Sequence, residues 1–301
     1  MRDYWFYGLR LRTPIPFEGL PAWPAGVEGE TWVLREAPVV ERLDEYDRGG
    51  ALATRPPGDA LVRLRRLFRM FVPAAGDATI EFLGGARPVD VEPYLLSFVA
   101  GVILHRRRRL PLHASCGWID GTAIAFVGRS GQGKSTLAAA LARDGQQLLS
   151  DDITVVTFDE AGAALATPGS PNLRLHEDSM GASGLDAEDF REVTTPGDKR
   201  IRVGRQAQFS PVPLAAVIRL EWEDVGGAPN IERLRGLAAF TPLDDVVYRL
   251  RMARRLGAAP ALSAALLRLA GSTPIYRLRR PRDFAALDAT ISLLRRDLAG
   301  Q

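Results

Sequence analysis

The chain has 301 residues, 46% of them hydrophobic and 25% charged, which is typical of a folded globular protein with one large or two modest domains. Its formal net charge is only +3, because 39 Lys and Arg residues nearly balance 36 Asp and Glu residues, so the overall charge does not favour a nucleic-acid-binding protein. No apolar run reaches the roughly 18 residues that a membrane span needs, no signal-peptide pattern is present, and Cys116 is the single cysteine, so we expect a cytoplasmic protein without nucleic-acid or membrane partners.

The first 88 residues predict a small β-rich domain. Three segments have the aromatic, alternating pattern of strands: residues 4–12, 31–35 and 78–82. Pro- and Gly-rich turns separate them, and the stretch from Gly84 to Pro88 is a plausible boundary. We therefore expect a domain at 1–88 and a second domain at 89–301.

The second domain has the mixed pattern of an α/β protein. Helices are expected over residues 92–106, 136–143, 244–256, 261–269 and 282–298. Strands are expected over residues 112–119, 123–127, 153–158, 214–222 and 275–278. Asp120-Gly121 suits a two-residue hairpin turn, and Gly145 suits the C-cap of the helix at 136–143. The last third of the chain is thus predicted to be mostly helical.

The most specific motif lies between the strand at 123–127 and the helix that follows. Residues 128–135 match the pattern G-x-x-x-x-G-K-[ST] of a P-loop, in which glycines let backbone N–H groups surround phosphate oxygens at a helix N-terminus. Lys134 would reach the β- and γ-phosphates, and Ser135 would offer its hydroxyl to Mg²⁺. The predicted nucleotide-binding residues are Gly128, Ser130, Gly131, Gln132, Gly133, Lys134, Ser135 and Thr136. We expect ATP or another NTP, with Mg²⁺, as the ligand.

Two adjacent carboxylates, Asp151 and Asp152, follow Lys134 by only one helix, which returns them to the phosphates. Phosphoryl transfer to a hydroxyl needs a metal clamp and a group that takes the hydroxyl proton, and two carboxylates in different surroundings can divide that work. The same pair could instead form an Asx-type turn that caps a strand. His113, on the strand expected to pair with the P-loop strand, is a catalytic candidate or a structural histidine.

Other P-loop classes leave no motif in the sequence. It contains neither the Leu-Ser-Gly-Gly-Gln signature of transport ATPases nor the Asn-Lys-x-Asp motif of GTPases. Residues 112–115, 128–136 and 148–152 together resemble the catalytic core of HPr kinase/phosphorylase, a P-loop kinase with a fold similar to phosphoenolpyruvate carboxykinase. The layout also resembles the HPr-kinase-like proteins of lasso-peptide biosynthesis, in which a strand like Tyr4-Trp-Phe-Tyr7-Gly8-Leu9 precedes the kinase core. Residues 168–175 fit these proteins too.

The resemblance implies an α/β fold: a P-loop kinase core of the HPr kinase type, a small β-rich N-terminal domain and a helical C-terminal segment. It implies a homo-oligomeric serine kinase whose substrate is the C-terminal Ser of a precursor peptide. Lys134 would contact the transferred phosphate, Asp152 would be the base, and Asp151 would lie near His113 or, with Ser135, bind the metal. The alternatives are a kinase of a small HPr-type protein and a non-catalytic P-loop regulatory or assembly ATPase.

The sequence departs from the HPr kinase pattern downstream of the carboxylates. Those kinases carry a second acidic metal ligand in a Glu-x-Arg-Gly motif, whereas residues 172–177 read Asn-Leu-Arg-Leu-His-Glu. Glu177, Asn172 or a water molecule could take that role, and no phosphorylase motif is evident. Residues 198–200, Asp-Lys-Arg, are expected in a loop, where their cations would either face the phosphates or be solvated.

Overall fold

The computed structural model divides the chain into two compact units. One unit holds Met1–Arg109 and Arg249–Leu262, and the other holds Leu110–Tyr248 and Ser263–Gln301. The boundary expected after residue 88 falls inside the first unit. The structure describes residues 1–40, 51–55, 58–64, 66–119, 121–143, 147–170, 172–183, 190–192, 199–202, 208–223, 227–244 and 246–298. Five residues used in the sequence predictions lie outside these ranges: Asp120, Gly145, Asp198, Pro171 of the stretch 168–175 and Asp245 of the stretch 244–256.

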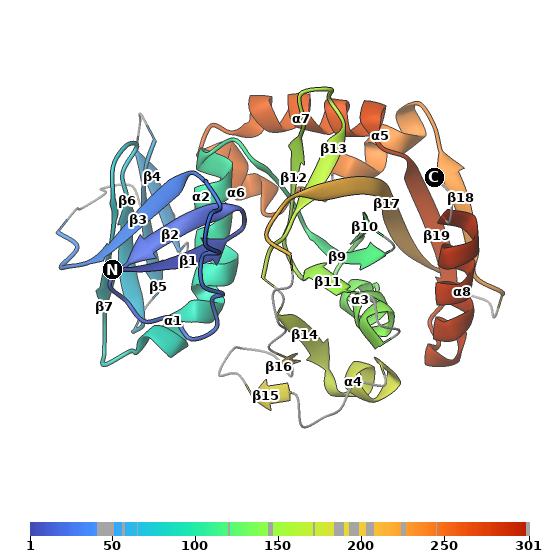
Figure 1. The fold of residues 1–301 in the computed structure, drawn as a ribbon, viewed down its shortest axis with the longest axis horizontal. Helices are drawn as coiled ribbons and strands as arrows, with labels where there is room; N and C mark the ends of the chain where they lie inside the picture. Colours follow the sequence, from blue (N-terminus) through green and yellow to red (C-terminus); the bar gives the residue numbers. More distant parts are fainter. Residues whose placement is uncertain are drawn as a thin grey trace. The chain divides into compact units, whose positions relative to one another are not determined.

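The first unit is built on a seven-stranded sheet with the order β1-β2-β3-β7-β6-β5-β4 (Figure 1). Its strands are β1 Arg2–Phe6, β2 Leu9–Thr13, β3 Thr31–Glu36, β4 Leu52–Arg55, β5 Asp59–Leu64, β6 Phe68–Val72 and β7 Ala78–Phe82. The strands predicted at 31–35 and 78–82 are confirmed as β3 and β7. The antiparallel run β4-β5-β6-β7 contains three strands that the sequence did not predict.

The single strand predicted over residues 4–12 is wrong. The chain turns at Tyr7-Gly8, where φ is +53° and +79°, and β1 pairs antiparallel with β2 so that Phe6 faces Leu9. A two-residue hairpin loop with φ positive at both positions has the signs of a type I′ turn, which matches the twist of the flanking strands. Tyr7 is an uncommon residue there. Its side chain is buried, and its hydroxyl donates to the carbonyl oxygen of Leu96 at 2.7 Å.

A continuous helical segment covers 88–106 and is longer than the helix predicted at 92–106. It comprises α1 Pro88–Tyr94, the π-helical turn η1 Leu95–Val99 and α2 Ala100–Arg106. Val91, Leu95, Val99 and Val102 recur at helical spacing and are fully buried, so they form the face that packs in the core. The predicted helix at 244–256 is shorter: α6 covers only Leu250–Arg255, because residues 246–249 form a turn.

The second unit contains a nine-stranded sheet in which β10, β17 and β19 are parallel neighbours. Its main path has the order β11-β9-β10-β17-β13-β12-β8, while β19 pairs with β17 and with β18. The strands are β8 Leu110–Leu112, β9 Ala114–Ile119, β10 Thr122–Val127, β11 Gln147–Ser150, β12 Thr154–Phe158, β13 Ala164–Thr167, β17 Val212–Glu223, β18 Asn230–Leu234 and β19 Ile275–Pro281. The carboxyl ends of the parallel strands therefore meet at one edge, which is where α/β sheets bind ligands.

The second unit also contains helices, two of which complete the core of this sheet. The helices are α3 Lys134–Arg143, α4 Glu177–Ser183, α5 Leu237–Asp244, α7 Ala259–Ser272, the 3₁₀ turn η3 Phe284–Ala286 and α8 Leu287–Leu298. A buried cluster joins Phe126, Ile218 and Leu278 of the parallel strands to Leu141 of α3 and Ile291 of α8, so both helices cover the same face (Figure 1). The predicted α/β class with a helical C-terminal segment is confirmed. No helix in the described ranges has the length and apolar character to span a membrane.

A small third sheet lies beyond α3. It comprises β14 Leu173–His176, β15 Phe190–Glu192 and β16 Lys199–Arg202, in the order β14-β16-β15. The loop predicted at 198–200 is thus wrong for Lys199 and Arg200, because both lie on β16 and pair with His176 and Leu175 of β14.

The Tyr7 hydroxyl gives a direct test of how the first hairpin is held. Tyr7→Phe should lower the free energy of unfolding by about 1 kcal/mol, because a buried carbonyl loses its hydrogen-bond donor. Tyr94→Phe is the control, since Tyr94 is only half-buried and no hydrogen bond of its hydroxyl occurs in the described part of the chain. Chemical denaturation measures both changes. Equal effects of the two substitutions would contradict this account of the turn.

Candidate functional site

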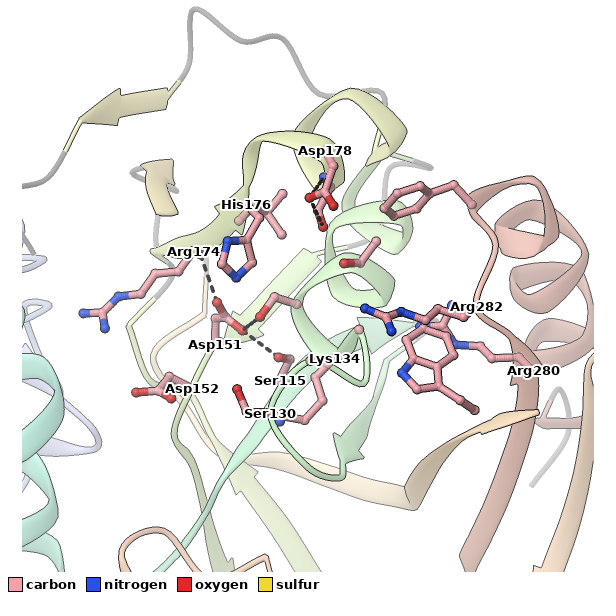
Figure 2. Close-up of a pocket in the computed structure, with 18 of the residues that line it drawn as sticks. Ser115, Ser130, Lys134, Asp151, Asp152, Arg174, His176, Asp178, Arg280 and Arg282 are labelled. Carbon is pink, nitrogen blue, oxygen red and sulfur yellow. Dashed lines mark hydrogen bonds between the residues drawn. The ribbon is translucent and has the colours of Figure 1, made fainter. Parts of the chain in front are cut away.

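A cavity of about 480 Å³ lies at the carboxyl edge of the parallel strands in the second unit (Figure 2). Nine of the residues predicted from the sequence line it: His113, Ser130, Gly131, Gly133, Lys134, Ser135, Thr136, Asp151 and Asp152. The predicted P-loop residues Gly128 and Gln132 are not in its lining. The structure therefore brings the P-loop, both carboxylates and the histidine into one place.

The P-loop joins β10 to α3 as the motif predicts. Gly128, Gly131 and Gly133 have φ of +146°, +84° and +77°, a region that favours glycine. A side chain at Gly128 would also be crowded, because a Cβ there would lie 2.3 Å from the Oε1 of Gln132 and 3.1 Å from the carbonyl oxygen of Leu220. Gln132 closes the loop internally, since its Oε1 accepts the Arg129 N–H at 2.6 Å.

Lys134 begins α3 and is bound to its own loop. Its Nζ donates to the carbonyl oxygens of Gly128 at 2.9 Å and Arg129 at 3.3 Å, and the residue is buried except for the part that lines the cavity. The ammonium is therefore held beside the glycine loop, at the N-terminus of a ten-residue helix whose partial positive charge adds to its own.

Asp151 is a buried carboxylate with donors from three elements. Its Oδ1 accepts the hydroxyls of Ser115 on β9 at 2.6 Å and Ser135 on α3 at 2.9 Å, and its Oδ2 accepts the backbone N–H of Arg174 on β14 at 3.0 Å (Figure 2). These bonds compensate the carboxylate for the water it loses on burial. They also hold the Asp151 carboxylate beside Ser135 of the P-loop.

Asp152 has a different environment from its neighbour. Its φ is +71°, a left-handed conformation that Asp tolerates better than most residues, and its side chain is 30% exposed. The Nδ1 of His113 lies 3.2 Å from the Asp152 carbonyl oxygen and 3.3 Å from its Oδ1. Because a carbonyl oxygen can only accept, this contact assigns the hydrogen to Nδ1. The Asp152 carboxylate thus lines the cavity next to a histidine donor.

The prediction that His113 lies on the strand beside the P-loop strand is wrong. The predicted strand at 112–119 breaks at His113 into β8, which pairs with β12, and β9, which pairs with β10. The backbone N–H of His113 donates to the carbonyl oxygen of Val246 at 2.7 Å instead of to a neighbouring sheet strand. The ring of His113 lies beside Asp152.

Neither Asn172 nor Glu177, the two side chains considered as a second metal ligand, is among the residues that line the cavity. Asn172 is buried, and Glu177 is the first residue of α4. Arg174 and His176 of β14 do line it. Among the described residues, no group of three or more His, Cys, Asp or Glu side chains is arranged to hold a metal ion.

A magnesium ion at a P-loop does not require such a group. It is held by the P-loop hydroxyl and one carboxylate, and phosphate oxygens and water complete its shell. Ser135 and Asp151 fit this donor set, because their oxygens lie 2.9 Å apart at the cavity.

Other cavity residues were not anticipated from the sequence. Trp222 and Arg280 are the next-to-last residues of β17 and β19, and Arg282 and Phe284 follow β19. Burial lowers the pKa of the Arg280 guanidinium to about 10, so it stays charged at neutral pH. Ser115 belongs to the stretch 112–115 that resembles HPr kinases, but the sequence predicted no function for its hydroxyl.

Comparisons with known proteins show similarities to P-loop proteins of two kinds, a GTPase and a kinase. No model of a protein family matches the chain. In an alignment of 321 positions that covers 91% of this chain and 73% of the relative, the chain is 27% identical to the tRNA modification GTPase MnmE of Cereibacter sphaeroides. The solved HPr(Ser) kinase/phosphatase from Coxiella burnetii matches with 14% identity and a TM-score of 0.33, over 63% of this chain and 99% of that one.

The two carboxylates should respond differently to magnesium. Asp151→Asn should reduce the gain in ATP affinity that Mg²⁺ provides by about 10- to 100-fold, because a neutral amide replaces a charged ligand. Asp152→Asn is the matched control and should keep that gain. Titration of a fluorescent ATP analogue with Mg²⁺ and with EDTA measures both. If Asp151→Asn kept the full effect of Mg²⁺, the metal would lie elsewhere.

Proposed function

We propose that the protein is a Mg²⁺- and NTP-dependent kinase that transfers a phosphoryl group to the serine hydroxyl of a small peptide. The observation that carries this proposal is the contrast between Asp151 and Asp152. The first is buried and bonded to the P-loop serine, and the second is partly exposed in the cavity beside His113. Adjacent carboxylates in such different surroundings suit a metal ligand and a proton acceptor.

The P-loop residues would bind and orient the nucleotide. Backbone N–H groups of the loop and the N-terminus of α3 surround the phosphates, and Lys134 supplies a positive charge that favours the transferring group. A Mg²⁺ ion held by Ser135 and Asp151 would neutralise further phosphate charge. Binding of ATP or another NTP is thus the first step of the proposed reaction.

The transfer itself balances without a further reactant. The serine oxygen forms a bond to the γ-phosphorus, and the bond from that phosphorus to the β,γ-bridging oxygen breaks, so the NDP leaves with the electron pair. The proton of the serine hydroxyl passes to the Asp152 carboxylate. His113 would act as a positioning residue, because its Nδ1 is within hydrogen-bond distance of the Asp152 carbonyl oxygen.

The identity of the acceptor rests on the sequence resemblance alone. That resemblance favours the C-terminal serine of a lasso precursor peptide, and a small HPr-type protein is the alternative. We further propose, from the same resemblance, that the protein is a homo-oligomer, and, from its single cysteine, that it acts in the cytoplasm. A peptide acceptor suits a cavity in which Asp152, Arg174 and His176 line the side away from Arg280 (Figure 2).

A second candidate is a regulatory or assembly protein that hydrolyses NTP and transfers nothing to a hydroxyl. The similarity to a protein named as a GTPase favours it. Against it, the sequence lacks the Asn-Lys-x-Asp motif of GTPases. Asp152 separates the two candidates, because a serine acceptor needs a proton acceptor in the cavity.

Replacement of the proposed base tests the function. Asp152→Asn should lower the rate of label transfer from ATP to a serine-bearing precursor peptide by roughly 10²- to 10⁴-fold. Nucleotide affinity should be kept, because Asp152 is not proposed to bind the nucleotide. The measurement is single-turnover transfer of γ-labelled phosphate, with binding measured separately.

Two controls make the outcome specific. A peptide with the acceptor Ser replaced by Ala should take no label, and Lys134→Ala should lose transfer because charge stabilisation at the phosphates is lost. An Asp152→Asn variant that transfers label at the wild-type rate would rule out Asp152 as the base. Nucleotide binding without transfer to any hydroxyl would support the regulatory candidate.

A further inference from the structure

Arg280 occupies an unusual position at the edge of the cavity. It faces Trp222 in the register of β17 and β19, and its guanidinium lies 4.4 Å from the centre of the Trp222 ring. Its Nη2 donates to the carbonyl oxygen of Gln132 in the P-loop at 3.2 Å, and only 3% of the residue is exposed. A buried cation is thus placed against the loop that would bind phosphates.

This cation has no acidic partner in the described part of the chain, unlike its neighbours. Arg277 and Arg279, on the opposite face of β19, form ion pairs with Glu221 and Glu232. Arg280 pairs with no described carboxylate, and its Nε is buried without a hydrogen-bond partner. Since burial of an unpaired charge is costly, an arginine in this state is suited to an anion that arrives from outside the chain.

The local packing points to the phosphate chain as that anion. A Cβ on Gly133 would lie 2.2 Å from the Nη2 of Arg280, so the missing side chain leaves the space that the guanidinium fills. The planar guanidinium can bind two phosphate oxygens at once, and its stacking on Trp222 limits its motion. Figure 2 shows Arg280 across Lys134 from Asp152 and Arg174.

We propose that Arg280 is a phosphate-binding residue of the NTP site, an arginine that the chain supplies to its own P-loop from the end of β19. This inference rests on the NTP binding that is part of the proposed function. It also specifies on which side of the cavity the phosphates and the acceptor bind. The phosphate chain lies between Lys134 and Arg280, and the acceptor enters from the side of Asp152. Trp222 acts as a positioning residue for the guanidinium.

The test compares Arg280→Met with Arg279→Met in the full chain. Affinities are measured by calorimetry for ATP, inorganic tripolyphosphate and adenosine. Arg280→Met should weaken ATP and tripolyphosphate binding by the same factor, about 10- to 100-fold, and leave adenosine unaffected, because only phosphate contacts are lost. Arg279→Met should leave all three affinities unchanged, because its guanidinium pairs with glutamates outside the cavity.

A thermal measurement shows that the loss is not one of folding. Without ligand, the melting temperature of Arg280→Met should be no lower than that of the wild type, since an unpaired buried charge has been removed. With ATP, the rise in melting temperature should shrink. If Arg280→Met did not fold, Arg280→Lys would be measured; it keeps a charge without the planar fork, and its tripolyphosphate binding should be measurably weaker than that of the wild type, by less than about tenfold.

The possible results separate this inference from the function on which it rests. The inference would be overturned if Arg280→Met bound tripolyphosphate with wild-type affinity. Where that variant does not fold, wild-type affinity of Arg280→Lys would overturn it. A loss of affinity confined to ATP and adenosine would also overturn it. That result would mean that Arg280 and Trp222 bind the adenine ring and not the phosphates. If the wild type bound tripolyphosphate through Arg280 but transferred nothing to a hydroxyl, the kinase proposal would fail and this inference would stand. If the wild type bound neither ATP nor tripolyphosphate, both would fail.

Discussion

The buried carboxylate of Asp151 is the contact on which the geometry of the cavity depends. It joins Ser115 of β9, Ser135 of α3 and the backbone of Arg174 on β14, so one side chain ties the sheet, the P-loop helix and the small sheet together. The carboxylate can be buried because these three hydrogen bonds replace those that it would make to water. With Asp151 fixed, the next residue turns through a left-handed conformation, and its carboxylate lines the cavity instead of the core.

A second constraint is the parallel arrangement of β10, β17 and β19. Parallel neighbours end at the same edge, so the P-loop after β10, Trp222 of β17 and Arg280 of β19 are brought together although they are far apart in sequence. In the resulting cavity Arg280 and Arg282 lie on one side of Lys134, and Asp152 lies on the other side (Figure 2). This division matches what phosphoryl transfer demands: charge compensation for the phosphates and a proton acceptor for the hydroxyl.

The sequence predicted those parts of the site that local patterns specify. The P-loop is recognisable because its glycines, its lysine and the flanking strand and helix are contiguous, and Asp151-Asp152 follow after a single helix. Trp222 and Arg280 were missed because no local pattern shows that β17 and β19 are parallel to β10, and Arg280 is one arginine among many. The hairpin at Tyr7-Gly8 was missed since a tyrosine with positive φ is uncommon. The break at His113 depends on a bond to Val246, more than a hundred residues away.

The central claim is that the cavity directs the γ-phosphoryl group to a hydroxyl and not to water. The most direct measurement is a ³¹P NMR time course of the full chain with Mg²⁺, ATP and a serine-bearing precursor peptide. The account predicts one phosphoserine ester for each ADP formed, with little inorganic phosphate, and slow ATP loss without the peptide. Formation of inorganic phosphate in step with ADP, with no phosphoester when the peptide is present, would contradict it.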